Sequence, residues 1–332
     1  MSRLSLSFAF AQNPRTKALF TGAVEPEGID LIPSEIGMSE LAWRQFGFHE
    51  FQVSELSISS LLMARSKGDD TFTAFPVFSS RIFFHTWVLV REDAGIDEPS
   101  QLNGKKVGVP EYQQTAALWA RGILQHEYGV DPRSIAWYME RPPEKSHGGV
   151  TGFSPPEGVR LQYMPRDSDM GQMLQKGEID AALLYIANNR NLVDRSTITF
   201  GEGSGVRALF LDKKAESTRF FSKTGIIPAN HTAVVRKDLL EEHPWVVLNL
   251  YSAFLEARAK AVEESKRQLA EMVDTAALQH PQARAWVDDP FPYGIQANRE
   301  TLEAAFAYSY EQGLSARKME IADVFYRGAL DL

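Results

Sequence analysis

The first third of the chain alternates short strand-like segments with helix-like segments. Such an alternation is typical of a parallel sheet whose strands are joined by crossover helices. A further strand is predicted at 72–78. We therefore expect an α/β protein. The alternating segments are Leu4 to Phe10, Thr16 to Phe20, Ile29 to Ile36, Ser39 to Phe46 and Phe51 to Ser57.

A second α/β unit is predicted after Gly95. The residues up to Pro110 have the pattern of a linker, a helical turn and a new strand. A helix is expected at 111–128, because apolar residues recur there at helical spacing and Gly129 can end it. Further strands are expected at 135–139, 159–164 and 180–186, and a helix at 170–176 that ends at Gly177.

Two β-rich segments, Arg81 to Val90 and Ile226 to Arg236, are longer than one sheet needs. We interpret them as crossings between two lobes, since 332 residues fit two domains of ordinary size. The predicted fold has two hinge crossings, and each lobe is a mixed sheet flanked by helices. Residues 1–97 and 227–332 would form lobe I, and residues 98–226 lobe II. Helices from Pro244 and from Asn298 to Gly313 would complete lobe I.

Charge and composition exclude several classes of function. There are 35 Lys and Arg against 43 Asp and Glu, a net charge of −8, which disfavours nucleic acid and anionic membranes as partners. The absence of cysteine excludes disulfides, thiolate metal sites and cysteine nucleophiles. The apolar stretch Leu4 to Phe10 is too short for a secretory signal, and no later stretch approaches a membrane span. We expect a cytoplasmic, unprocessed protein.

Several segments of the sequence resemble those of a known family. The segments 104–110, 176–181 and 234–238 resemble type II solute-binding proteins in general. Taken with five more specific segments, nearly the whole chain resembles the 4,5-dihydroxyphthalate decarboxylase family, which has the type II periplasmic-binding-protein fold without an export signal. These segments are Val107 to Gln113, Trp119 to Asp131, Lys223 to Thr232, Pro292 to Gly294 with Asn298 and Arg299, and Tyr308 to Ser315.

The chain departs from the family pattern at one place. Members usually carry an Ala-Arg-Ala-Pro type segment after the Asp-Ala strand, whereas this chain has Ile186 to Asn191 there. The segment Arg141 to Pro156 also matches loosely. Because these residues would line a cleft, the resemblance leaves the exact substrate and its ring substituents open.

Arg81 and His85 stand four residues apart on the first crossing, and hence on one side of an extended strand. An Arg fork can bind a carboxylate with two hydrogen bonds, and a His can exchange protons near neutral pH. The alternative is a surface Arg and a core His. His231 lies on the second crossing, and it is either a cleft residue or a His packed among apolar neighbours.

Glu111, Tyr112 and Gln113 follow Pro110 at a strand-to-helix turn, where free backbone N–H groups favour an anion. Glu111 could donate a proton, although acidic residues are common in first helical turns. Arg15 stands at the carboxyl end of the first strand, the usual ligand edge of an open α/β sheet. Its alternative is a solvated loop residue. Substrate binding is also expected of Asn298 and Arg299, from the resemblance.

The remaining histidines show no ligand-like spacing and are interpreted as structural or exposed. They are His49, His126, His147, His243 and His280. No organic cofactor is expected. A divalent metal that bridges catecholic oxygens stays open, as does assembly into a homo-oligomer.

The resemblance implies that the chain decarboxylates a hydroxylated aromatic acid. One of His85 and His231 would accept the phenolic proton, and the other, or Glu111, would protonate the ring carbon that bears the carboxylate. Arg15, Arg81 and the amides after Pro110 would hold the carboxylates. The competing classes are a solute-binding protein of the ABC-transporter type and a cytosolic binder of an aromatic or organic acid, because one cleft can host many ligands.

Overall fold

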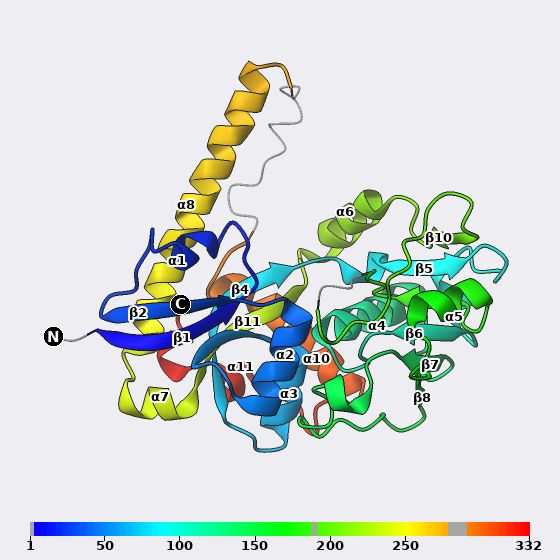
Figure 1. The fold of residues 1–332 in the computed structure, drawn as a ribbon, viewed down its shortest axis with the longest axis horizontal. Coiled ribbons are helices and arrows are strands. Elements are labelled where there is room, and N and C mark those ends of the chain that lie inside the picture. Colours follow the sequence, from blue (N-terminus) through cyan, green and yellow to red (C-terminus); the bar gives the residue numbers. More distant parts are fainter. Residues whose placement is uncertain (1–2, 188–190, 278–290) are drawn as a thin grey trace.

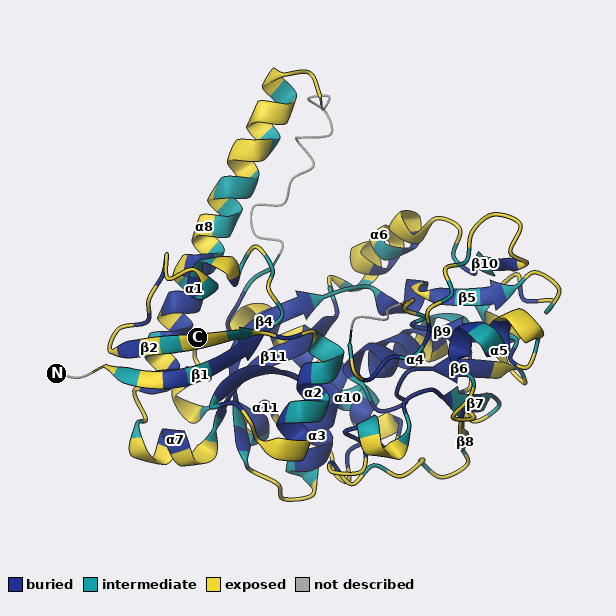
Figure 2. Ribbon diagram, in the orientation of Figure 1, coloured by how far each residue is buried: buried dark blue, intermediate teal, exposed yellow. Residues whose placement is uncertain are grey.

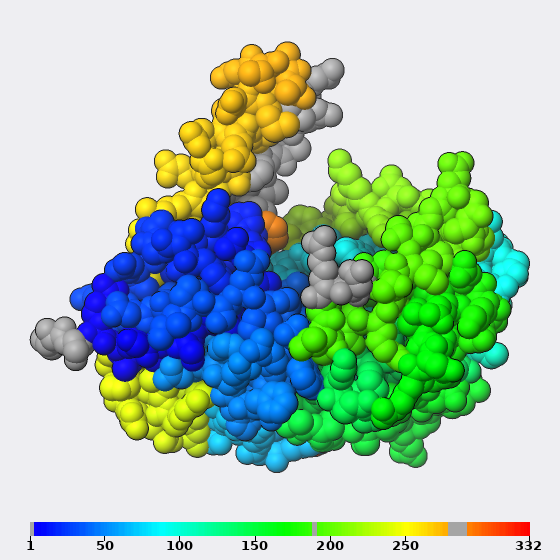
Figure 3. Space-filling model, in the orientation of Figure 1, coloured from blue at the N-terminus to red at the C-terminus, as the bar shows by residue number. Residues whose placement is uncertain are grey.

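The structure, a computed structural model, describes residues 3–187, 191–277 and 291–332. Two mixed sheets lie side by side, each flanked by helices, and they form two lobes (Figure 1). The predicted α/β fold is confirmed. In the space-filling view, residues of the two lobes meet along the middle of the molecule (Figure 3).

The first sheet has the order β2-β1-β3-β11-β4. β1 runs parallel to β2 and β3, and β11 runs antiparallel to β3 and β4. The alternation in the first strand places Leu6, Phe8 and Phe10 in a buried apolar cluster with α8. The strands are β1 (Leu4–Phe10), β2 (Ile29–Glu35), β3 (Val53–Ser57), β4 (Phe72–Arg81) and β11 (Ala229–Arg236).

The second sheet has the order β10-β5-β9-β6-β7-β8. β6 is parallel to β7 and β9, β7 is parallel to β8, and β5 is antiparallel to both its neighbours. The strands are β5 (Val88–Arg91), β6 (Lys106–Val109), β7 (Ala136–Met139), β8 (Arg160–Tyr163), β9 (Ala181–Leu183) and β10 (Val206–Ala208).

The helices that the sequence predicts are present close to their expected bounds, whereas α3, α6, α7 and α11 were not predicted. Glycines in the left-handed conformation end two of the predicted helices, Gly129 after α4 and Gly177 after α5. The α-helices are α1 (Lys17–Phe20), α2 (Met38–Phe48), α3 (Ile58–Ser66), α4 (Thr115–Tyr128), α5 (Met170–Lys176), α6 (Lys213–Thr224), α7 (Lys237–Glu242), α8 (Val246–Asp274), α10 (Arg299–Glu311) and α11 (Ile321–Val324). The 3₁₀ turns are η1 (Phe84–Thr86), η2 (Pro99–Leu102), η3 (Pro143–Lys145), η4 (Gln296–Asn298) and η5 (Arg327–Ala329).

The crossings between the sheets differ from those expected. β5 pairs within the second sheet, so the chain leaves the first sheet after Arg81 and has changed sheets by Val88. The change of sheet therefore precedes residue 97. The return crossing includes α6, and β11 lies wholly within the first sheet.

Two helices have special positions. The buried residues of α8 lie between Val246 and Ala257, and the rest of this helix extends away from the body (Figure 2). α10 packs against both α3 of the first lobe and α4 of the second. None of the helices in the described ranges combines the length and apolar character needed to cross a membrane.

Candidate functional site

Polar side chains that follow strands of both sheets meet between the lobes. Ser57 and Ser60 stand where β3 passes into α3, and Glu111 stands where β6 passes toward α4. His147 belongs to the segment after β7. The carboxyl ends of strands are the usual ligand edge of such sheets, so this is the place to look for a site.

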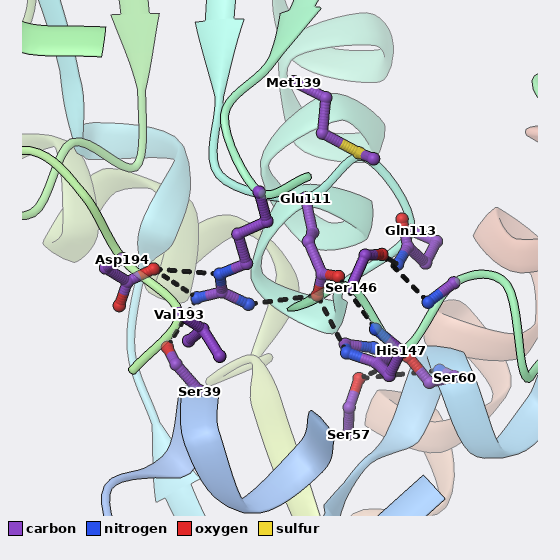
Figure 4. A network of polar contacts seen from close by, with 12 residues as sticks. Ser39, Ser57, Ser60, Glu111, Gln113, Met139, Ser146, His147, Val193 and Asp194 are labelled. Atoms are coloured by element: carbon purple, nitrogen blue, oxygen red, sulfur yellow. Dashed lines mark hydrogen bonds and ion pairs between the residues drawn. The ribbon is translucent and has the colours of Figure 1, made fainter. Parts of the chain in front are cut away.

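Glu111 lies at the centre of a buried network in the second lobe (Figure 4). Its Oε2 lies 3.0 Å from Nη1 of Arg141 and 2.8 Å from Nδ1 of His147. The backbone N–H of His147 donates to Glu111 Oε1 at 3.2 Å. Arg141 in turn donates to Asp194 Oδ1 at 2.7 Å from Nη2. One buried guanidinium thus pairs with two carboxylates.

The same network contacts the first lobe. Nε2 of His147 lies 2.7 Å from Ser60 Oγ, and Nη2 of Arg141 donates to Ser39 Oγ at 2.6 Å. The ring of His147 also stacks on Phe46 with centroids 5.5 Å apart. The structure therefore shows the lobes joined across this network.

A second group of hydroxyls joins the N-termini of α3 and α4. Thr115 Oγ1 lies 2.8 Å from Ser57 Oγ and accepts from the backbone N–H of Ser59 at 2.9 Å. Ser57 is also the N-cap of α3, and its side chain accepts from Ser60 N–H.

Glu111 is ionised in this environment. Burial would raise its pKa, but the charges of His147 and Arg141 and the hydrogen bonds of His147 and Ser146 lower it from the ordinary 4.5 to about 2. The expectation that Glu111 donates a proton is therefore corrected for this state, because a carboxylate with such a pKa carries no proton at neutral pH.

A second His–carboxylate pair lies in the first sheet. Nδ1 of His231 lies 3.1 Å from Glu55 Oε2, and this oxygen also accepts from the hydroxyl of Ser79. The backbone N–H of Ala11 donates to Glu55 Oε1 at 2.6 Å. His231 is the register partner of Ser57, so the pair stands beside the hydroxyl group that joins the lobes. Its side chain is 8% exposed, and Nε2 has no hydrogen-bond partner within the described ranges.

Two arginines flank this pair. Arg15, after β1, donates from Nη2 to the carbonyl of Ser79 at 2.7 Å and stacks on Phe291. Arg81, at the end of β4, donates to the carbonyls of Ile227 and Pro292. The sequence places Arg15 at the carboxyl end of the first strand, and the structure has it just after β1. That Arg15 and Arg81 contact the substrate stays a prediction.

His85 lies elsewhere. It belongs to the 3₁₀ turn η1 rather than to an extended strand, so it does not share a strand face with Arg81. Its side chain is fully buried, with Nε2 3.0 Å from Glu216 Oε1 of α6 and Phe220 packed beside it. The expected pairing of Arg81 with His85 is wrong, because the chain bends after Arg81 to change sheets.

The residues after Glu111 divide between core and site. Tyr112 is buried in the core of the second lobe, with Arg121 over its ring at 3.7 Å and Trp137 at its edge. It does not face the network, which corrects its expected contact with substrate. Gln113 is buried close to Ser146 and His147, and its Oε1 has no partner among the described residues.

Asn298 and Arg299 are adjacent in the sequence but have different surroundings. The Asn298 amide donates to the carbonyls of Gly294 and Pro292 and accepts from Arg81, so it shapes the segment before α10. Arg299 is half-exposed and pairs with Glu303 one turn along α10. Its expected role in substrate binding is not supported, because this pair lies away from the network.

Glu55 and His147 are the site residues that the sequence did not reveal. Glu55 is a single acid in a buried strand, and only its pairing with His231 gives it a role. His147 was interpreted as structural. The segment that contains it, Arg141 to Pro156, matches the family loosely, which was the one available signal. No three His, Asp or Glu side chains converge as a metal site in the described ranges.

The comparisons with known proteins agree with the two-lobed fold. Residues 44–283 match the family described as "ABC transporter, phosphonate, periplasmic substrate-binding protein". The aliphatic sulphonate binding protein SsuA of Escherichia coli has a similar structure, with a TM-score of 0.55, 14% identity and coverage of 100% of this chain and 94% of that one. The alkanesulfonate-binding protein SsuA of Xanthomonas axonopodis pv. citri gives 0.56 and 11%, covering 98% and 99%. The chain thus has the two-lobed fold of the periplasmic binding proteins.

Two relatives with higher sequence identity than these binding proteins carry the names of enzymes. A 4,5-dihydroxyphthalate decarboxylase of Comamonas testosteroni is 31% identical over 100% of this chain and 99% of its own length. One of Pseudomonas putida is 33% identical over 55% of this chain and 71% of its own. The chain belongs to the 4,5-dihydroxyphthalate decarboxylase family, which confirms the resemblance drawn from its sequence segments.

Proposed function

We propose that this protein decarboxylates a hydroxylated aromatic acid such as 4,5-dihydroxyphthalate, and that the reaction takes place between the two lobes. The observation that carries the proposal is the pair of His231 and Glu55, which stands beside Arg15 at the ligand edge of the first sheet. Full-length relatedness to a decarboxylase of that name supports the substrate class.

The chemistry requires two proton transfers. A base takes the proton of the hydroxyl para to the reacting carboxylate, and an acid protonates the ring carbon that bears this carboxylate. The C–C bond then breaks, CO2 leaves, and its electron pair restores the aromatic ring as a phenolate, which regains a proton from the base. One proton is consumed for each CO2 released. Without the ring protonation, CO2 loss would leave an aryl carbanion.

His231 is the side chain best placed for such a transfer. The Glu55 carboxylate holds Nδ1, which fixes the ring and leaves Nε2 to exchange a proton with the substrate. His147 is the second candidate, and its ring is held by Glu111 on one side and Ser60 on the other. Glu111, with a pKa of about 2, would orient His147 rather than supply a proton.

The test is turnover of 4,5-dihydroxyphthalate, followed as CO2 release. His231→Asn and Glu55→Gln should lower kcat by about 10²- to 10⁴-fold, the usual contribution of general acid–base catalysis. His126→Asn is a matched control, because His126 also pairs with a glutamate, Glu311, but on the exposed surface. It should keep full turnover.

Near-normal kcat in both the His231 and Glu55 variants would refute this assignment and make His147 the residue to replace next. The binding-protein family match favours one other function, that of a binder for an aromatic acid. Tight binding of phthalates by the wild type without any CO2 release, with or without added divalent metal, would establish that reading. A cytoplasmic location stays a prediction.

A further inference from the structure

Within the described parts of the chain, two buried hydrogen-bond donors close to the proposed site have no acceptor. They are the hydroxyl of Tyr293, in a residue that is 6% exposed, and Nε of Arg15. Among the described residues neither atom has a well-aligned hydrogen bond, and the polar neighbour of the Tyr293 hydroxyl is the Arg15 side chain, which cannot accept a proton from it. Leaving a buried polar atom unpaired is energetically unfavourable. Such atoms are rare in native proteins, and each needs an explanation.

Both donors are held in place. Nη2 of Arg15 donates to the carbonyl of Ser79 at 2.7 Å, and the guanidinium lies 4.4 Å from the centre of the Phe291 ring. Phe291 and Tyr293 belong to the same short segment before α10, and the backbone N–H of Gly294 fixes that segment to Pro76 of β4 at 2.9 Å. The positions of the donors are therefore set by the fold.

The surroundings are positive. Burial raises the pKa of the Tyr293 hydroxyl, and the nearby charges of Arg15, Arg258 and Arg81 only partly offset this effect. The hydroxyl therefore stays protonated and can donate at neutral pH. Arg15 forms no ion pair with a carboxylate in the described parts of the chain. An anion is the ligand that such a group of charges and donors favours.

This donor pair is joined to the proposed catalytic pair through a single residue. The carbonyl of Ser79 accepts from Arg15, and its hydroxyl donates to the Glu55 oxygen that holds His231. A carboxylate bound by Arg15 and Tyr293 would place its aromatic ring next to His231.

We infer that Arg15 and Tyr293 bind the carboxylate that the substrate keeps, so that the site selects aromatic dicarboxylates and also binds the monocarboxylate product. The inference rests on the proposed function. The carboxylate that departs loses its charge as CO2 forms, and a strong cation on it would stabilise the ground state and oppose the reaction. A fixed guanidinium and hydroxyl suit the carboxylate that keeps its charge throughout.

Tyr293→Phe tests this assignment, because it removes only the hydroxyl. Calorimetry would measure the binding of phthalate and of the product 3,4-dihydroxybenzoate, alongside kcat and KM for 4,5-dihydroxyphthalate. We expect both affinities to fall by roughly 10- to 100-fold, as for a lost hydrogen bond to a charged group. KM should rise by a similar factor while kcat stays within about threefold, the pattern of lost uniform binding. Tyr310→Phe, at an exposed tyrosine of α10, is the matched control.

Unchanged affinity for both ligands would overturn the inference, whatever the turnover. Unchanged affinity for the product with a lower kcat would overturn it too, because the hydroxyl would then act on the departing carboxylate. If the wild type releases no CO2 but Tyr293→Phe still weakens phthalate binding, the anion site stands and only the proposed reaction fails.

Discussion

At the residue scale, three histidines of this chain are each paired with a glutamate in the interior, but in different surroundings. His231 keeps one ring nitrogen available, whereas His147 is held on both sides. His85 is sealed under α6 with Glu216. The same pair of residue types can therefore serve proton transfer, the joining of the lobes or packing. The surroundings of the ring distinguish these roles, because Nδ1 of the sealed His85 also has no partner among the described residues.

The burial of His85 predicts a pH dependence of stability. Burial lowers the pKa of His85 below its ordinary 6.5, and the hydrogen bond to Glu216 only partly compensates. Below about pH 6.5 the unfolded chain binds a proton at this position that the folded chain does not bind, so stability falls as the pH falls. The slope from this one group is at most about 1.4 kcal/mol per pH unit.

Urea unfolding of the wild type and of His85→Gln between pH 7.5 and 5 checks this prediction. The wild type should lose stability more steeply than the variant, because the other histidines contribute equally to both. If the free energy of unfolding changes with pH in the same way for both proteins, His85 has the same pKa in the folded and unfolded chains.

Residue types alone revealed part of the site. Arg15 and His231 could be found because each stands where a predicted strand ends or crosses. Glu55 could not, since an acid inside an apolar strand acquires its meaning only from a partner 176 residues away. The placement of Tyr112 failed for a related reason: the turn directs this ring into the core of the second lobe, where Arg121 covers it.

At the element scale, α10 connects the lobes. It follows the segment that carries Tyr293, and its Tyr308 ring packs against the backbone of Gly122 in α4. The indole N–H of Trp119, also in α4, donates to the carbonyl of Ala229 in β11 at 2.9 Å. Thus α4 is fixed to the first lobe from two sides.

The contact at Gly122 predicts that Gly122→Ala is destabilising. A methyl group there would overlap the Tyr308 ring, and overpacking of this kind costs about 1–3 kcal/mol. Gly47→Ala in α2 is the matched control, since nothing lies within 4 Å of the added carbon. It should be neutral or stabilising by up to about 1 kcal/mol.

Thermal unfolding of the two variants against the wild type checks the prediction. A melting temperature of Gly122→Ala at or above that of Gly47→Ala would contradict it. The Tyr308 ring also stacks on the His126 ring at the surface. The NMR chemical shifts of the His126 ring would therefore report whether α4 and α10 separate.

The elements themselves were largely predictable, because their signals are local. Apolar periodicity placed α4, and Gly129 and Gly177 marked the ends of α4 and α5. The turn at η1 was not predictable in the same way. The run from Arg81 to Val90 has uniform strand character, yet it divides between two sheets, and no local residue preference marks where the chain changes its partners.

At the scale of the whole molecule, the sequence predicts two lobes and two crossings, but not which groups join the lobes. The structure joins them through side chains that are distant in sequence, such as Ser39 with Arg141 and Ser57 with Thr115. Residues 188–190 of the segment that departs from the family pattern, and His280, lie outside the described residues.

The joined lobes predict a measurable opening when these contacts are removed. Ser39 and Ser60 donate or accept hydrogen bonds across the boundary without belonging to the His231 pair. A hydrogen bond to a charged group such as Arg141 contributes about 1.5–3 kcal/mol. Each 1.4 kcal/mol changes the ratio of closed to open molecules about tenfold. The double variant Ser39→Ala with Ser60→Ala should therefore populate the open form in the absence of ligand.

Small-angle scattering should show a larger radius of gyration for the double variant than for the wild type. Saturating phthalate should reduce this radius again, because a ligand between the lobes favours closure. Ser217→Ala on α6 is the control and should scatter like the wild type, because within the described residues this hydroxyl bonds only to Lys213 of its own helix. A double variant that scatters like this control would show that other contacts, such as α10 on α4, hold the lobes together on their own.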